Sequence, residues 1–295
     1  MKLAALGEDR LLAQLLPNLP SNGSVVLGAG DDCAVVEAPG KSKLQLLKTD
    51  CVVEGIHFTA KSPPAFVGWK AMARPMSDFA AMSGVPQFAL VTMIVPAHKT
   101  LDWVKQVYRG LEKAARVFDV TIVGGETSNI KGPAVISVSV TGFVEKHRWV
   151  GQSGGKAKDE LFVTGRLGGS LRGRHLKFTP RIEESRWLTK HFSIHAMMDL
   201  SDGLGADLPR LARASHVGFE VDEVALPLNR GCTTEQAISD GEDYELLFAI
   251  SPANARALPT RWRKQFSKVP LTRIGRLIPK SKIQNLKWRG YAHFQ

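Results

Sequence analysis

Six acidic clusters form the pattern in this sequence that is most informative about chemistry. Each sets an Asp or a Glu beside a glycine or a hydroxyl residue: Gly30-Asp31-Asp32, Thr49-Asp50, Ser77-Asp78, Gly125-Glu126-Thr127, Asp199-Leu200-Ser201-Asp202-Gly203 and Gly241-Glu242-Asp243. A single cluster is explained by a turn or a helix N-cap. Six together favour hard cations, because Mg²⁺ takes carboxylate and hydroxyl oxygens and completes its shell with substrate phosphates. The sequence therefore indicates a nucleotide site with several metal ions.

Hydrophobic periodicity predicts a mixed α/β chain that places these clusters at strand ends or helix starts. Strands are expected at residues 44–47, 88–95, 120–123, 135–144, 161–164 and 244–250, and helices at 65–83, 101–118, 182–191 and 203–214. The strand at 120–123 is expected to stop at Gly124-Gly125. The stretch GQSGGKAK at residues 151–158 is the best linker. We therefore expect two domains, residues 1–148 and residues 149–295.

Several common enzyme signatures are missing from the sequence. There is no Walker A motif, no protein-kinase motif set, no H-E-x-x-H and no G-x-S-x-G. The familiar nucleotide folds, the metalloproteases and the α/β-hydrolases therefore lose their usual support. Gly165 to Gly169 follows a predicted strand, but a lone glycine-rich turn is weak support for a phosphate loop.

The net charge of +11 is concentrated at the C-terminal end. From Ser251 onward there are eleven Lys or Arg residues and no Asp or Glu, so the charges before that point balance. Apolar residues are interleaved with the basic ones, which indicates folded structure with a solvated basic face. An RNA-binding patch and a surface that attracts phosphorylated substrates are the alternatives, and we do not expect a nucleic-acid partner.

The three cysteines, Cys33, Cys51 and Cys232, have no C-x-x-C spacing and predict neither a disulfide framework nor a zinc site. This usage fits a reducing cytoplasm. The first twenty residues predict an amphipathic helix, because charged residues interrupt the apolar stretch well before signal-peptide length. No apolar run is long enough to span a bilayer. We therefore expect a soluble cytoplasmic protein.

Seven strings resemble, in order and over nearly the whole chain, the motifs of the thiamine-monophosphate kinase family. They are GDDCAVV, KTDCVVEGIHF, SDFAAMSGVP, VGGETS, MMDLSDGLGADL, SDGEDYELLF and the closing GYAHF. The resemblance implies the two-domain α/β fold of aminoimidazole-ribonucleotide synthetase, with an N-terminal sheet that binds nucleotide and metal and pairs with that of a second subunit in a homodimer. It also implies in-line transfer of the γ-phosphoryl group of ATP to thiamine monophosphate, assisted by Mg²⁺.

The resemblance also implies roles for individual residues. Metal positions are Asp32, Lys48, Thr49, Asp50, Asp78, Glu126, Asp199 and Asp202, of which Asp78 and Asp202 are the catalytic ones; Gly125, Glu126, Gln152 and Ser201 lie at the nucleotide; and His57, Glu242 and Tyr291 face thiamine monophosphate. From the residues alone, His57 is as well explained as a core histidine, and Tyr291 as packing of the C-terminus. Glu242 fits a solvated charge cluster, and Asp199 fits a brace for the following helix.

Five positions depart from the family pattern. Lys48 stands where the family usually has a serine, Glu126 where it has an aspartate, Gln152 where it has an arginine, Pro75 where it has an asparagine and Asp240 where it has a glycine. One hypothesis is that Lys48 supplies the charge lost at Gln152. The departures leave open a related enzyme with another acceptor, or a non-catalytic protein that kept the fold. Retention of so many aspartates favours an enzyme.

Overall fold

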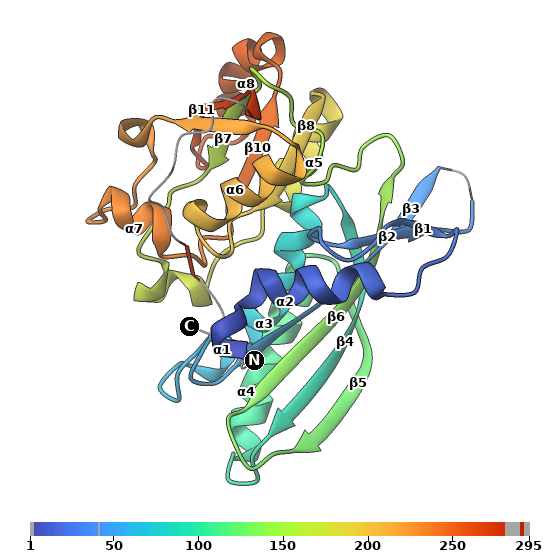
Figure 1. The fold of residues 1–295 in the computed structure, drawn as a ribbon. Coiled ribbons are helices and arrows are strands. Elements are labelled where there is room, and N and C mark those ends of the chain that lie inside the picture. Colours follow the sequence, from blue (N-terminus) through green and yellow to red (C-terminus); the bar gives the residue numbers. More distant parts are fainter. Residues whose placement is uncertain (1–2, 41, 281–289, 292–295) are drawn as a thin grey trace.

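The structure, a computed structural model, describes residues 3–40, 42–280 and 290–291, and it contains two sheets (Figure 1). The element order is α1 (Leu3–Leu6), α2 (Glu8–Leu15), β1 (Val25–Leu27), β2 (Ala34–Glu37), β3 (Lys43–Val53), α3 (Pro64–Ala81), β4 (Val85–Val95), α4 (Leu101–Val117), β5 (Thr121–Asn129), β6 (Val135–Glu145), β7 (Glu160–Thr164), α5 (Ile182–His191), β8 (Ile194–Asp199), α6 (Leu204–Ala214), β9 (Gly218–Val221), α7 (Thr234–Ser239), β10 (Leu246–Ile250), α8 (Pro252–Gln265) and β11 (Leu271–Ile278). The mixed α/β class predicted from the sequence is confirmed.

The first sheet has six strands in the order β1-β2-β3-β6-β4-β5. All neighbours are antiparallel except β4 and β5, which are parallel. α3 packs on one face of this sheet, and α4 packs closely against α3. Two glycines permit this approach, because a Cβ on Gly68 would lie 1.9 Å from the Val107 carbonyl oxygen and one on Gly110 equally close to that of Ala65. The other face of the sheet, which points away from α3, leaves Phe88 and Leu90 of β4 about half exposed.

The second sheet is antiparallel, with five strands in the order β8-β10-β7-β11-β9. α6 covers one face with a leucine-rich cluster. α5 and α8 cover the other face, where Trp262 of α8 and Phe248 of β10 belong to a cluster rich in aromatic residues. Ala80 and Ala81, at the end of α3, belong to this second aromatic cluster. α3 is therefore packed into the cores of both halves of the molecule.

The positions predicted for three of the acidic clusters, at strand ends or helix starts, need correction. β3 continues through Asp50 to Val53 because β6 pairs with all eleven of its residues. β5 does not stop at Gly124-Gly125 but runs to Asn129, since Gly125 allows β4 to approach: a Cβ there would lie 1.8 Å from the Val91 carbonyl oxygen. Asp78 lies in the last turn of α3 rather than at a helix start. Asp50 and Glu126 thus lie inside strands, and Asp78 lies near the end of a helix rather than at its start.

The two ends of the chain bear on the remaining predictions. The amphipathic helix expected at the start is divided into α1 and α2 at Gly7, whose φ of 76° favours glycine. Among the described residues, no helix combines the length and the apolarity that crossing a membrane requires. The described part of the basic C-terminal region contains α8 and β11, and its Arg273 and Arg276 pair with Glu160 and Glu220 on neighbouring strands; Lys282, Lys287 and Arg289 lie outside the described residues. The predicted boundary after residue 148 falls between β6 and β7.

Candidate active site

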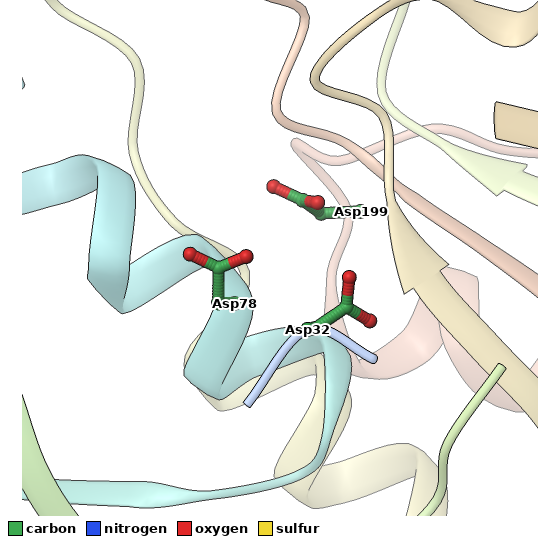
Figure 2. A group of neighbouring side chains, drawn as sticks. All are labelled: Asp32, Asp78 and Asp199. Atoms are coloured by element: carbon green, nitrogen blue, oxygen red, sulfur yellow. The ribbon is translucent and has the colours of Figure 1, made fainter. Parts of the chain in front are cut away.

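Three buried aspartates from distant parts of the chain meet between the two sheets (Figure 2). Asp32 lies in the turn before β2, Asp78 in the last turn of α3, and Asp199 at the end of β8. One carboxylate oxygen of each lies within 4.8 Å of the others. Their exposed fractions are 8%, 7% and 3%. We call these three residues the aspartate triad.

Two basic side chains lie beside the triad, on the side where β3 faces α3. Because side chains alternate along a strand, Lys48 and Asp50 both point toward α3. The Lys48 ammonium lies 3.0 Å from Asp78 Oδ1, and Arg74 lies 3.3 Å from Asp50 Oδ1. Burial opposes the charge of Lys48, but the neighbouring aspartates raise its pKa, so it stays protonated. Lys48 therefore binds a triad carboxylate directly.

The triad carries more negative charge than its surroundings neutralise. Burial, and then repulsion from Asp199 and from its neighbour Asp31, raise the pKa of Asp32 well above its usual range. Burial raises the pKa of Asp199 to about 6, against the hydrogen bond that it accepts from Ser77. Asp32 Oδ2 is buried and has no hydrogen-bond partner among the described residues. An unpartnered buried carboxylate oxygen is costly unless a cation meets it, and oxygen ligands of this kind suit Mg²⁺.

Gln152 lies at the triad, at the start of the predicted linker. Its side-chain amide donates to Asp32 Oδ1 at 3.1 Å, and its backbone N–H donates to Asp31 Oδ2 at 3.0 Å. Gly151 next to it has no room for a side chain, because a Cβ there would lie 2.7 Å from the same Asp31 oxygen. The predicted nucleotide residue Gln152 is therefore bonded to the acidic turn before β2.

A pocket next to the triad collects most of the residues predicted for substrate. It is lined by Ile56, His57, Arg74, Leu171, Ser201, Asp202, Asp240, Glu242, Tyr244 and Tyr291. Arg74 lines this pocket and also pairs with Asp50, so it marks the place where the pocket meets the carboxylates. Tyr291 is fixed there by its backbone N–H, which donates to the Asp202 carbonyl at 2.9 Å. The structure thus brings His57, Glu242 and Tyr291 together with Ser201 and Asp202.

Glu242 lines the pocket, and two basic side chains already bind its carboxylate. Lys70, which is fully buried, pairs with Glu242 Oε2, and the His175 imidazole contacts the same oxygen at 3.0 Å. Burial works against ionisation of Glu242, but the bonds to His175 and Lys70 lower its pKa to about 2. Burial in turn lowers the pKa of Lys70 to about 8 in spite of Glu242. His57 is oriented too, because its Nδ1 accepts the Val53 N–H at 3.0 Å.

Three predicted site residues lie away from the triad within one chain. Thr49 points to the opposite face of β3, where its hydroxyl accepts a hydrogen bond from Ser139 at 2.9 Å. Gly125 and Glu126 are exposed on β5, at the edge of the sheet. β6 and β4 lie between β5 and β3, so β5 is about 14 Å from β3 at roughly 4.8 Å per strand spacing.

The sequence analysis did not identify several charged residues of the site. Lys70 and Arg74 lie eight and four residues before Asp78 on α3, and this spacing places all three on one helix face. That spacing is a signal that identifies them once Asp78 is assigned. Asp207, fully buried, accepts the Asp202 N–H at 3.0 Å and is held by Arg210. Nothing in the local sequence distinguishes His175.

Comparisons with known proteins bear on what this site does. The family described as AIR synthase related protein, N-terminal domain, matches residues 30–144, and the family described as AIR synthase related protein, C-terminal domain, matches residues 140–284. The thiamine-monophosphate kinase of Rhodopirellula baltica is 35% identical over 97% of both proteins. The solved structure of AaThiL complexed with AMPPCP and TMP has a TM-score of 0.86 and 32% identity, and the match covers 99% of each chain. These findings confirm the resemblance seen in the sequence.

A more distant likeness concerns the fold alone. The hydrogenase maturation protein HypE of E. coli matches 96% of both chains with a TM-score of 0.69, at 19% identity. The two-sheet architecture is therefore shared by proteins of different activity, and function must be argued from the residues of the site.

Proposed function

The chain belongs to the thiamine-monophosphate kinase family, and from this premise we propose that it transfers the γ-phosphoryl group of ATP to the phosphate of thiamine monophosphate. The observation that carries the proposal is the position of the aspartate triad beside a pocket lined by the residues expected at the substrate. Phosphoryl transfer depends mostly on positioning and charge neutralisation. A cluster of carboxylates that binds cations can provide both at the phosphates.

Mg²⁺ is part of this proposal, and the residues fit it. The donor set is all carboxylate oxygen, and the buried Asp32 Oδ2 lacks a partner among the described residues. Asp32, Asp78 and Asp199 would hold the ion, which would neutralise phosphate charge during transfer. Ser77 orients Asp199 through a hydrogen bond of 2.6 Å. Asp202, another predicted metal position, is paired with Arg210 and lines the pocket.

The pocket would hold the acceptor. Arg74 provides a positive charge where the pocket meets Asp50, in a position suited to an anionic phosphate. Ile56 and Tyr291 provide apolar surface for the organic part of the molecule. A phosphate monoester with a second pKa near 6 is already ionised at neutral pH, so no strong general base is required. Glu242, which is ionised across that range and bound by Lys70 and His175 at Oε2, lines the wall of the same pocket.

A homodimer also belongs to the proposal. The sheet face that points away from α3 exposes Leu90 and Phe88, each about half accessible, and the edge strand β5 adds Val123 at 56% exposure. Exposed apolar side chains on a sheet with an open edge support pairing with another copy. Glu126 does not reach the triad of its own chain, so its predicted role at metal and nucleotide depends on this dimer. The cytoplasmic location predicted from cysteine use also remains part of the proposal.

The test is production of ADP and thiamine diphosphate from ATP and thiamine monophosphate, with Mg²⁺ and with EDTA. We expect product only with Mg²⁺, and none from Asp78→Asn. Asp102→Asn, on the exposed first turn of α4, is the matched control and should behave as the native chain does. No product from a folded dimer would overturn the assigned acceptor. ATP binding would then separate a kinase with another acceptor from a non-catalytic protein.

A further inference from the structure

The chain's own side chains already occupy part of the aspartate triad. Ser77 donates to Asp199 Oδ2 at 2.6 Å, and the Gln152 amide donates to Asp32 Oδ1 at 3.1 Å. Each of these two carboxylates therefore has one oxygen bound by a neutral donor. The other oxygen of each accepts no hydrogen bond from the described residues, and for Asp32 that oxygen is buried.

The third triad carboxylate differs, because a cation binds it. The Lys48 ammonium lies 3.0 Å from Asp78 Oδ1. Asp50, the nearest further carboxylate on β3, is paired with Arg74 at 3.3 Å. Lys48 and Asp50 are two residues apart on the same face of β3. A second ion between Asp78 and Asp50 would have to displace two positively charged side chains.

We propose that the Lys48 ammonium takes the place of one divalent cation, so that the triad binds a single divalent cation through the one oxygen that each aspartate leaves open. This inference rests on the proposed function, because it concerns how the same carboxylates are neutralised. A tethered ammonium needs no dehydration from bulk water and stays in the site through every turnover, whereas Mg²⁺ dehydrates reluctantly. The chain therefore enters each cycle with part of the triad's charge already compensated.

The inference explains why a lysine is tolerated among metal-binding residues. A lysine that merely repelled the metal would abolish the site, because like charges a few ångströms apart are strongly unfavourable in a buried setting. Here Lys48 binds Asp78 Oδ1, which leaves Asp78 Oδ2 for the ion. One oxygen from each of three aspartates is a sufficient protein ligand set for a hard cation that keeps waters and phosphate oxygens as its other ligands.

The experiment counts bound Mn²⁺ on the nucleotide-free full-length protein, by equilibrium dialysis and electron paramagnetic resonance. We expect one tightly bound Mn²⁺ per native chain, and none at this site in Asp32→Asn. Lys48→Ser should bind a second Mn²⁺. Lys48→Met, which keeps the volume of the side chain without its charge, should do the same if the serine variant folds poorly. Lys43→Ser is the matched control on the same strand, since Lys43 lies over the Phe143 ring and away from the triad.

Two results would overturn the inference. The first is a native chain that binds two Mn²⁺ ions, both lost in Asp32→Asn. The second is a single ion in both folded Lys48 variants. Because neither ATP nor thiamine monophosphate is present, the outcome is separable from the proposed function. Product formation together with two ions would refute this inference alone, and one ion without product would refute the proposed function alone.

Discussion

Two groups of carboxylates in this protein are compensated differently. Just before β10, each of three carboxylates is paired with a basic side chain: Glu242 with Lys70, Asp243 with Arg174 and Glu245 with Arg181. The aspartate triad has three carboxylates and one ammonium, that of Lys48. Asp243 and Glu245 are as buried as the triad, so burial alone does not identify a site. The number of basic side chains per carboxylate does identify a site, because buried negative charge that no side chain balances must be met by a metal ion or by protons.

The contrast is not absolute. Burial still raises the pKa of Asp243 to about 6, although Ser170 and Arg174 both bind it. The paired group nevertheless differs from the triad, because each of its carboxylates is bound by a basic side chain of the same protein and needs no added cation. Four measurements test whether the triad serves catalysis and the paired carboxylates serve stability.

Removing one triad carboxylate should have the largest effect. Asp199→Asn takes away an ionic ligand at the reacting phosphates, and we expect turnover to fall by at least about 10³-fold, the upper range for loss of one electrostatic contact in an active site. Steady-state rates at saturating Mg²⁺ measure this. Turnover within tenfold of the native rate would show that the triad is not the catalytic group of carboxylates.

A carboxylate of the paired group should instead govern stability. Glu245 accepts two hydrogen bonds from Arg181, at 2.6 and 2.7 Å, and one from Thr164 at 2.8 Å. Glu245→Gln leaves the arginine charge without its counter-ion but keeps one acceptor oxygen. We expect about 2 kcal/mol of lost stability, less than the 3–5 kcal/mol for loss of a whole buried partner. Chemical denaturation measures it.

The control for that change is Glu183→Gln, the same substitution at an exposed position in the first turn of α5. Its stability should stay within about 0.5 kcal/mol of the native value. A loss of turnover in Glu245→Gln larger than its loss of stability would place this glutamate in the chemistry and weaken the comparison.

The metal-free protein should be more stable in mild acid than at neutral pH. The folded-state pKa of Asp199, about 6, lies above its ordinary value of 3.8, so the native state binds more protons between those values and stability falls as pH rises. From pH 5 to pH 7, Asp199 alone should cost about 1.4 kcal/mol. Thermal unfolding in EDTA measures this. The slope should weaken in Asp199→Asn, and an unchanged slope would assign it to other groups.

The smallest effect should come from a pair at the surface. Arg276 and Glu220 are joined at 2.8 Å, with side chains 55% and 42% exposed. Water and salt screen such pairs, so Arg276→Ala should change the free energy of unfolding by less than about 1 kcal/mol. A loss above about 2 kcal/mol, measured by denaturation, would mean that this basic strand is structurally more important than its exposure indicates.

The local sequence was sufficient to predict much of this arrangement. Helical periodicity placed α5 and α6 within a residue of their ends, because their apolar positions recur on one face. Ordered motifs brought Asp32, Asp78 and Asp199 to one site in advance of any coordinates. What they could not show is pairing across the chain, such as Lys48 with Asp78 or Lys70 with Glu242.

The misjudged positions have a common physical cause. Asp50 and Glu126 were expected at strand ends because Asp, Glu and Gly disfavour strand interiors. Both lie inside long strands, where backbone pairing with β6 or β4 outweighs the local preference. Thr49 shows a related limit, since the two-residue period of a strand places neighbours in sequence on opposite faces of the sheet.

The shared helix α3 has a consequence for modularity. Its middle packs in the core of the first sheet, and its last residues, Ala80 and Ala81, lie in the aromatic cluster of the second. A chain cut in the 151–158 stretch would leave the second half with an uncovered apolar surface where α3 belongs. Two domain families follow one another along the sequence, yet a chimera that exchanges one half would also have to match the surface that the end of α3 covers.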